Sequence, residues 1–539
     1  MQLSELIIRE ARERGLQHFF GIPGGGIPLE LMDWGRTLGV DFVPVAHESS
    51  AAIMAAYYGF LKNTAGLALA VKGVGAGNLV GGAVNAYFER VPVVCCCECG
   101  PAETRHLELV SQCAHQGLFD AIVKYQASLE SETAHGTLQE AFFQATDGRP
   151  GPVLLDVPTD LGITEVVNGA QETRSPSPLA PDESKLETLR EVLLRAKKPI
   201  VLAGADVIRA DASQELLSLV ESIGAAVLVQ MDAHGVFPES HPRWAGTFVG
   251  HQSPNTIEGE LAPQADLAVL VGCDSLVSDR QWGSELPTYE LVARKEYESL
   301  AAQPLLRFDG NLKVSLSQLL SEPNREGFPV QDIERTREKV LMNFRRPGGA
   351  RLAAQDIIEI TRSRMPADGI LVSETGIFIL MLHHLWPFDQ PGRHLCTAGG
   401  RTMGLTLPAI LGAKLARPET PMVGIGADGS ALMRLGELEV FARTGVSAPL
   451  VILNDHALGT MKSRQQFRGM TDYGLDLHPV DLAGIARASG LNGVVVETPE
   501  EYDNELKKAF ESNRTTLIDA RVDPLAYQES FAATLGILD

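Results

Sequence analysis

The sequence predicts an α/β protein made of three doubly wound domains, each built on a largely parallel sheet. Short apolar runs typical of buried strands alternate with helical patterns along the 539 residues, as βαβ units require. Two polar stretches rich in proline, glycine and serine, 168–185 and 321–349, interrupt this alternation. We therefore expect an N-terminal domain over 1–167, a central domain over 186–322 and a C-terminal domain over 350–539.

Buried strands are predicted in the first two blocks wherever an apolar run is bounded by turn residues. The N-terminal block closes with such a run at 152–158, and the central block contains three more, at 199–205, 226–229 and 267–272. Gly204 follows the first of the central strands, but no Gly-x-Gly-x-x-Gly follows it. The sequence therefore gives only a weak indication of a dinucleotide in the central block.

The C-terminal block contains the most informative motif. A strand at 421–425 runs into Gly-Ala-Asp-Gly-Ser, a helical pattern follows at 431–442, and a second strand at 448–453 ends before Asn-Asp. Because parallel strands open their carboxyl ends at one sheet edge, Asp428 and Asp455 are expected side by side at that edge. Two carboxylates suit Mg²⁺, and glycines at a helix start suit phosphate oxygens. The unit therefore predicts a magnesium-bridged diphosphate site.

A second candidate lies in the N-terminal block, where a short strand at 43–48 ends in Glu48 and a small-residue helix follows at 49–57. A carboxylate at a strand end before a tightly packed helix is expected to be partly buried. Burial raises the pKa of a carboxyl group toward the range useful for acid–base chemistry. The alternative is an acid that only caps the helix beside its macrodipole.

These motifs, together with strand-to-glycine-loop segments at 19–26 and 71–78 and a segment at 402–413, resemble those of thiamine-diphosphate-dependent enzymes. The resemblance is to the group of acetolactate synthase, pyruvate oxidase and benzoylformate decarboxylase, and it covers nearly the whole chain in order. It implies that the three domains are the pyrimidine-binding, central and diphosphate-binding domains. Ala427 replaces a glycine of the family motif, and Asp455 replaces an asparagine.

The resemblance assigns cofactor roles in the C-terminal block. It implies that the side chains of Asp428 and Asp455 and the backbone carbonyl of Ala457 hold Mg²⁺, and that Gly429 and Ser430 contact the diphosphate. Asp455 keeps an oxygen ligand but adds a negative charge near the diphosphate. Metal affinity or metal preference is therefore expected to differ from that of the family.

The resemblance also assigns the groups around the pyrimidine and thiazolium rings. It implies that Glu48 bonds N1′ of the aminopyrimidine and that Met403 wedges between the two rings. The carbonyl of Arg401 and the amide of Met403 would bind the pyrimidine edge. Three further residues are expected at the cofactor: Gly376, Leu458 and Gly459.

The substrate pocket is the least determined part of the site. The segment 375–378 is apolar where synthases carry polar residues, which indicates a more hydrophobic cavity and a bulkier substrate. His106 and His115 are isolated candidates, and Lys72 or Arg464 is considered for a substrate carboxylate against the alternative of plain surface charge. The residues predicted to line the pocket are Gly25, His115, Ile377, Phe378 and Met461.

Composition excludes several classes of function. The formal charge of −22 argues against nucleic acid or anionic membranes as partners. No window approaches the roughly 18 apolar residues of a membrane helix, and the first ten residues lack the shape of a signal peptide, so the cytoplasm is expected. The four cysteines between Cys95 and Cys99 continue a strand whose side chains alternate between faces, which predicts buried thiols rather than a metal site.

The function predicted from these features is thiamine-diphosphate- and Mg²⁺-dependent decarboxylation of a 2-oxo acid, with the acyl anion open to carboligation as in acetolactate synthase. The alternatives are a non-ligating decarboxylase of an aromatic or branched 2-oxo acid, of the benzoylformate decarboxylase kind, an inactive cofactor-binding relative, and a flavin-bearing oxidase with FAD. The resemblance implies a homodimer or homotetramer with active sites between subunits.

Overall fold

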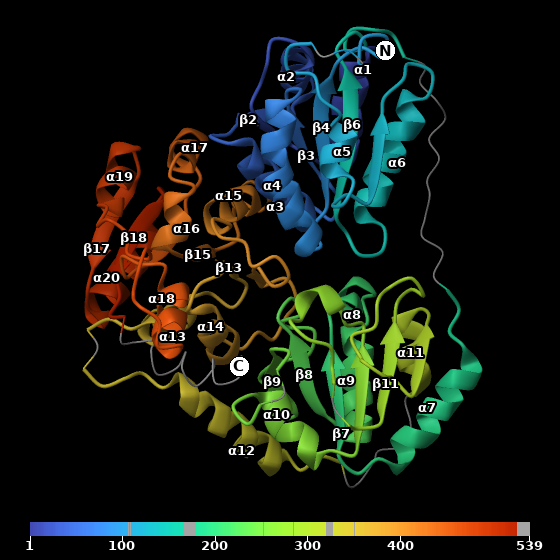
Figure 1. The fold of residues 1–539 in the computed structure, drawn as a ribbon, viewed down its shortest axis with the longest axis vertical. Helices are drawn as coiled ribbons and strands as arrows, with labels where there is room; N and C mark the ends of the chain where they lie inside the picture. Colours follow the sequence, from blue (N-terminus) through green and yellow to red (C-terminus); the bar gives the residue numbers. More distant parts are fainter. Residues whose placement is uncertain are drawn as a thin grey trace.

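The fold is that of a computed structural model, which describes residues 1–105, 107, 109–166, 179–251, 253–283, 285–319, 327–349 and 351–524. It contains three six-stranded sheets, each flanked by helices (Figure 1). Every pairing between neighbouring strands is parallel. The predicted fold class, an α/β protein of three doubly wound sheets, is confirmed.

The N-terminal sheet has the order β2-β1-β3-β4-β6-β5. Its strands are β1 (His18–Gly21), β2 (Asp41–Pro44), β3 (Gly66–Ala70), β4 (Val93–Cys99), β5 (Tyr125–Ser128) and β6 (Pro152–Pro158). Its helices are α1 (Leu3–Glu13), α2 (Ile27–Leu38), α3 (Glu48–Leu61), α4 (Val74–Phe88), α5 (His115–Phe119) and α6 (Ala134–Thr146). The thiols of Cys95, Cys96, Cys97 and Cys99 are free and buried in β4, and burial raises their pKa values.

The central sheet has the order β12-β11-β10-β7-β8-β9. Its strands are β7 (Pro199–Ala203), β8 (Ala226–Gln230), β9 (Trp244–Phe248), β10 (Leu267–Val271), β11 (Thr288–Val292) and β12 (Leu306–Asp309). The helices from α7 to η3 are α7 (Glu183–Arg195), α8 (Asp206–Arg209), α9 (Ser213–Ile223), α10 (Ile257–Leu261), η1 (Ala262–Gln264), η2 (Ser275–Val277), α11 (Leu312–Leu319), α12 (Val330–Leu341) and η3 (Met342–Phe344).

The C-terminal sheet has the order β14-β13-β15-β16-β18-β17. Its strands are β13 (Ile370–Ser373), β14 (His394–Leu395), β15 (Met422–Ala427), β16 (Pro449–Asn454), β17 (Asn492–Val496) and β18 (Thr516–Arg521). Its helices are α13 (Ala354–Arg364), α14 (Ile379–Leu385), α15 (Thr406–Ala416), α16 (Asp428–Leu432), α17 (Glu437–Thr444), α18 (Gly459–Phe467), α19 (Leu482–Ala488) and α20 (Pro499–Glu511). No helix in the described part of the chain combines the length and the apolar character that crossing a bilayer needs.

Helix α3 of the N-terminal domain packs against α15 of the C-terminal domain and is buried over almost its whole length. Glycines allow its backbone to touch three neighbours. A Cβ at Gly66 of β3 would lie 1.8 Å from Ala55 O, one at Gly82 of α4 would lie 2.3 Å from Ser49 O, and one at Gly412 of α15 would lie 2.3 Å from Met54 O. The apolar, small-residue composition of α3 follows from this close approach on all sides.

The start of α3 differs from the sequence expectation. Strand β2 ends at Pro44, where its pairing with Gly21 ends, and Glu48 is the first residue of the helix rather than the last of a strand. His47 caps the helix, since its Nδ1 accepts a hydrogen bond from Ser49 N at 3.2 Å. The three intervening residues turn the chain, so Glu48 enters the helix buried rather than at a strand tip.

The contact of α15 with α3 can be tested at Gly412. We expect Gly412→Ala to lower the free energy of unfolding by about 1–3 kcal/mol, because the added methyl group meets Met54 O. The matched control is Gly136→Ala in α6, where nothing lies within 4 Å and where higher helix propensity should stabilise by up to about 1 kcal/mol. Thermal unfolding of both variants measures the difference, and an equal stabilisation by both would contradict the close packing.

Candidate active site

The C-terminal sheet brings two acidic side chains to one edge. Strands β15 and β16 pair in parallel with Ala427 opposite Leu453, so Asp428 and Asp455 leave neighbouring strands at the same end. Asp455 also packs against the first residue of α18, because a Cβ at Gly459 would lie 2.6 Å from Asp455 Oδ2. A side chain at Gly459 would therefore displace the carboxylate.

The two carboxylates form a site of concentrated negative charge. Burial, and then the charge of Asp455, raise the pKa of Asp428 to about 7. Backbone amides hold both groups: His456 N donates to Asp428 Oδ2 at 2.9 Å, and Ala457 N donates to Asp455 Oδ1 at 3.0 Å. A hard divalent cation with oxygen ligands would relieve this repulsion, so the donor set fits Mg²⁺.

Three of the predicted cofactor residues lie together beside this pair. A Cβ at Gly429 would lie 2.9 Å from Leu458 Cδ2 and 3.6 Å from Met403 Cε. Met403 keeps about a third of its surface exposed (36%), whereas Ser430 is buried. The space above Gly429 is thus walled by Met403 and Leu458, and only glycine leaves it open.

The loop that carries Arg401 and Met403 is held by the N-terminal domain. The carboxylate of Glu89, just after α4, accepts hydrogen bonds from the Thr397 hydroxyl at 2.7 Å and from Gly400 N at 2.8 Å, besides two other backbone amides. Asn85 Nδ2 donates to the Thr402 hydroxyl at 3.0 Å. Arg401 itself has a φ of 45°, an uncommon left-handed conformation that these contacts fix.

Glu374 is a positioning residue that the sequence analysis missed. Directly after β13, its carboxylate accepts hydrogen bonds from Ala427 N and Thr406 N, both at 3.1 Å. It therefore joins the residue before Asp428 to the start of α15, close behind Met403. Burial raises the pKa of Glu374 to about 7. The available signal was an acid directly after the short strand Ile370–Ser373, of which the first three residues are apolar.

The raised pKa of Glu374 predicts a pH dependence of stability. The folded chain holds the proton up to about pH 7, whereas the unfolded chain releases it near 4.5, so the stabilisation is complete below 4.5 and is lost as pH rises through 7. We expect Glu374→Gln to remove this pH-dependent part of the free energy of unfolding, which is on the order of 3 kcal/mol between pH 4.5 and 8. Thermal unfolding across this range measures it, and an unchanged pH profile would contradict the assignment.

Glu48 is buried at the start of α3, where its Oε2 accepts a hydrogen bond from Asn78 Nδ2 of α4 at 3.0 Å. The next residue, Ser49, accepts a hydrogen bond from Arg434 Nη1 at 2.6 Å and so ties this end of α3 to the C-terminal domain. Among the described residues of one chain, no hydrogen bond or ion pair joins Glu48 to Asp428.

The predicted substrate residues are dispersed in one chain. His115 is buried, with Nδ1 2.8 Å from Asp156 Oδ1 and Nε2 accepting from Gly73 N, and it lines a cavity of about 100 Å³ with Lys72 and Arg105. Gly25 has open space around its Cα, and Met461 is 44% exposed on α18.

The other two predicted pocket residues, Ile377 and Phe378, are buried in a hydrophobic cluster of the C-terminal and central domains. A Cβ at Gly376 would meet the Phe378 ring at 2.5 Å, so Gly376 allows this inward packing. His106 lies outside the described residues. His383 and His384 form an adjacent pair in α14 that is visible in the sequence but was not predicted as part of a site.

The carboxyl edge of the central sheet is bridged by arginines from the N-terminal domain. Arg149 pairs with Asp206 after β7 and with Asp274 after β10, both at 2.9 Å, and Arg90 pairs with Asp274 at 2.8 Å. These strands flank the point where the strand order reverses, which is where open sheets bind nucleotides. A cavity of about 1300 Å³ lies beside the bridge, lined by Asp206, Arg294 and other residues.

Comparison with known families matches all three domains. Residues 1–128 match the thiamine pyrophosphate enzyme N-terminal TPP binding domain, 186–292 the central domain, and 374–520 the C-terminal TPP binding domain. The acetolactate synthase large subunit of Haemophilus influenzae is 27% identical over 96% of this chain and 94% of its own. The sulfoacetaldehyde acetyltransferase of Alcaligenes xylosoxydans is 24% identical over 95% of this chain and 90% of its own.

A solved structure has the same fold. The thiamine diphosphate-dependent 4-hydroxybenzoylformate decarboxylase of Rhodococcus jostii RHA1 superposes with a TM-score of 0.83, is 23% identical, and covers 97% of this chain and 99% of its own. The fold and the acidic edge define a cofactor-dependent α/β enzyme. The chain belongs to the thiamine pyrophosphate enzyme family. The predicted family and its cofactor, thiamine diphosphate with Mg²⁺, are thereby confirmed.

Proposed function

We propose that this enzyme decarboxylates a 2-oxo acid and transfers the resulting acyl group to a second carbonyl compound, as an acetolactate-synthase-like carboligase. The observation that carries the proposal is the acidic pair Asp428 and Asp455 beside the Gly429 space that Met403 and Leu458 enclose. Relatives named as acetolactate synthases match the chain over nearly its whole length, which supports the ligating reaction. The decarboxylase neighbour supports the non-ligating alternative only at the level of the fold.

Each part of the site has a stated task in this proposal. Asp428, Asp455 and the carbonyl of Ala457 hold Mg²⁺, and Gly429 and Ser430 accommodate the diphosphate. Bound thiamine diphosphate supplies the nucleophilic carbon and the electron sink for decarboxylation. Glu48, oriented by Asn78, holds and releases a proton at its carboxylate.

The remaining residues position the cofactor and limit the pocket. Met403 borders the space above Gly429, and Glu89 and Glu374 fix the segments on either side of Met403. The central domain is proposed to work without flavin, because Arg149 and Arg90 bridge its switch-point edge with Asp206 and Asp274. This disfavours the oxidase alternative.

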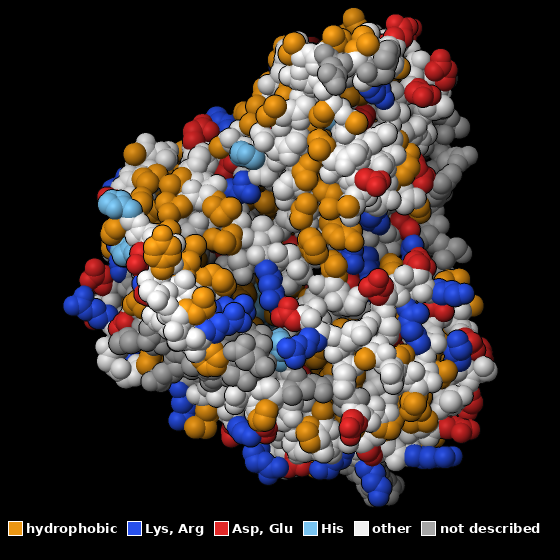
Figure 2. Space-filling view, viewed as in Figure 1, with side chains coloured by type: hydrophobic (Ala, Val, Ile, Leu, Met, Phe, Trp, Pro, Cys, Tyr) orange, Lys and Arg blue, Asp and Glu red, His pale blue; other side chains and the backbone are white. Residues whose placement is uncertain are grey.

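A second copy of the chain is proposed to complete the active site. Apolar side chains stay exposed around the start of α4 and around α16 and α18 (Figure 2), namely Val74, Met403, Met433, Met461 and Phe467. Such a surface next to the cofactor residues fits burial against another subunit. Glu48 of one chain would then face Asp428 of the other, which agrees with the lack of a direct contact within one chain.

The reaction is tested with a panel of 2-oxo acids in the presence of thiamine diphosphate and Mg²⁺, with products identified by mass. We expect a 2-hydroxy ketone or 2-hydroxy-2-alkyl-3-oxo acid product, and Glu48→Gln should lower kcat about 10²–10⁴-fold with little change in cofactor binding. Asp33→Asn, at an exposed ion pair, is the matched control and should keep full activity. An aldehyde as sole product would favour the simple decarboxylase. Unchanged turnover in Glu48→Gln would refute the catalytic role of Glu48, and no turnover of any 2-oxo acid by the cofactor-loaded wild type would favour the inactive relative.

Metal and cofactor binding are tested at the acidic pair. We expect Asp428→Ala to weaken Mg²⁺-dependent binding of thiamine diphosphate at least about 100-fold, because a ligand and its charge are lost. Asp455→Asn keeps an oxygen ligand, so its affinity for thiamine diphosphate in the presence of Mg²⁺ should stay within about tenfold of that of the wild type. Calorimetric titration with Mg²⁺ or with EDTA measures both, and equal binding by Asp428→Ala would refute the site.

The same two inactive variants test the shared active site. In a mixed oligomer of Glu48→Gln and Asp428→Ala chains, one of the two sites combines an intact Glu48 with an intact Asp428. Activity should therefore reappear on mixing and subunit exchange. Continued inactivity in a mixed oligomer shown by mass to contain both chains would place each site within a single chain.

A further inference from the structure

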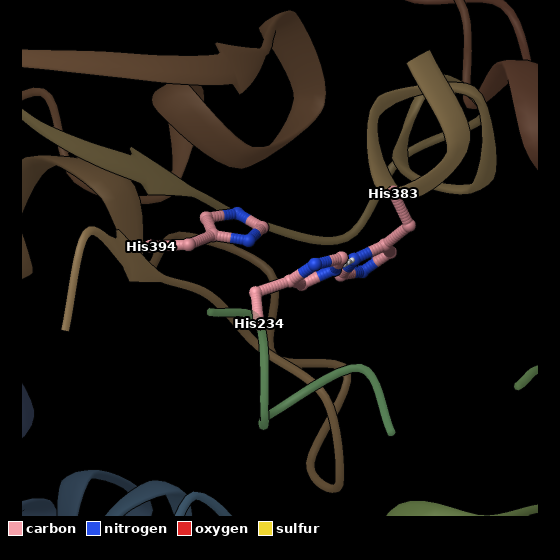
Figure 3. Close-up of side chains that lie close together, drawn as sticks. All are labelled: His234, His383 and His394. Carbon is pink, nitrogen blue, oxygen red and sulfur yellow. Dashed lines mark hydrogen bonds between the residues drawn. The ribbon is translucent and has the colours of Figure 1, made fainter. Parts of the chain in front are cut away.

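Three histidines converge at the contact between the central and C-terminal domains, outside the site described above. His234 lies in the turn after β8, His383 is in α14 and His394 begins β14. Each offers a ring nitrogen within 4.8 Å of those of the other two. Figure 3 shows the three rings close together, with a hydrogen bond between His234 and His383.

We propose that His234, His383 and His394 bind one transition-metal ion of the Zn²⁺ class, which clamps the central domain to the C-terminal domain. Imidazole nitrogen is the preferred neutral ligand of such ions, whereas Mg²⁺ prefers oxygen. The site is therefore chemically separate from the acidic pair Asp428 and Asp455.

The spacing of the rings agrees with coordination. An ion about 2.0 Å from each nitrogen in tetrahedral geometry holds the ring centres about 5.2 Å apart. The observed separations are 5.0 Å between His234 and His383 and 5.4 Å from His394 to each of them. His234 Nε2 and His383 Nδ1 are 2.7 Å apart, so one of the two nitrogens donates a hydrogen bond to the other. Metal binding would replace this hydrogen bond and would require both rings to rotate until their nitrogens point to one ion.

Groups outside the three rings already select the coordinating nitrogens. Glu239 Oε1 lies 2.7 Å from His234 Nδ1, which leaves His234 Nε2 as its ligand atom, in the carboxylate–histidine–metal arrangement common in proteins. The Ser373 hydroxyl lies 2.8 Å from His394 Nε2, which leaves His394 Nδ1 as its ligand atom. The Glu239 carboxylate also accepts from Gly235 N and Phe388 N, so its position is fixed.

The cluster is not satisfied by its own hydrogen bonds. Of the ligand atoms in this arrangement, His394 Nδ1 is buried and has no partner among the described residues, although an unpaired buried nitrogen costs free energy. Burial is the main cause that lowers the pKa values of His383 and His394 well below the ordinary range.

The surroundings favour a buried structural ion. Phe388 stacks on the His394 ring at 4.9 Å with an angle of 8° between the planes, and Trp386 stacks on Phe388. Gly235 brings the turn of His234 against the C-terminal domain, since a Cβ there would lie 2.1 Å from Gln390 O. The metal would thus hold α14, whose preceding loop carries the predicted residues Gly376 to Phe378.

The test uses the full-length protein, stripped with a chelator and then saturated with Mg²⁺ and thiamine diphosphate so that the acidic pair is filled. Titration with Co²⁺ should give one equivalent per chain, the visible absorption of four-coordinate Co²⁺, and a higher unfolding temperature; Zn²⁺ should displace it. Elemental analysis of protein purified without chelator should find the bound metal. A folded wild type that gives no such absorption and no stoichiometric Zn²⁺ or Co²⁺ would overturn the proposal.

Variants distinguish Co²⁺ binding at the three histidines from Co²⁺ binding elsewhere on the protein. His234→Ala and His394→Ala should each weaken Co²⁺ binding at least 100-fold, and Glu239→Gln should weaken it about 10–100-fold. The matched control is His241→Ala, which changes a partly exposed histidine a few residues along the same segment. Both His241→Ala and Asp428→Ala should bind Co²⁺ as tightly as the wild type does. Binding of Mg²⁺ and thiamine diphosphate by each histidine variant checks that it is folded. Undiminished Co²⁺ binding by folded His234→Ala and His394→Ala would refute the assignment.

Discussion

Close backbone contact around α3 is the constraint on which the arrangement of the active site depends. Gly66, Gly82 and Gly412 let β3, α4 and α15 approach this helix more closely than any side chain would allow. The helix begins with Glu48, and α15 begins just after Met403, so the same packing fixes the residue proposed for acid–base chemistry and the residue proposed to wedge between the cofactor rings. Tightly packed interiors transmit small displacements. A single methyl group added to this contact should therefore displace both the start of α3 and the start of α15.

Carboxylates inside the protein hold the loops near the active site in place. Glu89 gathers the amides of the loop before Met403, and Glu374 joins the start of α15 to the residue before Asp428. Each satisfies several backbone donors that would otherwise be buried without partners. Glu239 does the same beside the histidine cluster. These acids therefore set the geometry of the segments that carry the proposed cofactor residues, and burial raises the pKa of Glu89 and Glu374.

The predictable parts of the site were those with local signatures. Asp428 and Asp455 follow two apolar strands, and parallel pairing alone brings such residues to one edge. Glu89 and Glu374 were not predicted, because their partners are 308 or more and 32 or more residues away and only folding brings them together. Ile377 and Phe378 were expected in a pocket, yet one chain buries both in a core cluster, since an apolar pattern does not tell a cavity from a core. His383 was overlooked although its tandem pair stands in the sequence.

The sequence by itself determined the fold class, the family and the acidic edge, because hydrophobic periodicity, glycine placement and residue order are local properties of the chain. Only the tertiary structure decided that Glu48 starts a helix, and it also decided which buried acids hold the cofactor loops. It likewise brought His234 to His383, which is 149 residues away, and to His394, which lies further along the chain. Such contacts depend on how domains pack, and packing between domains leaves no periodic pattern in a single sequence.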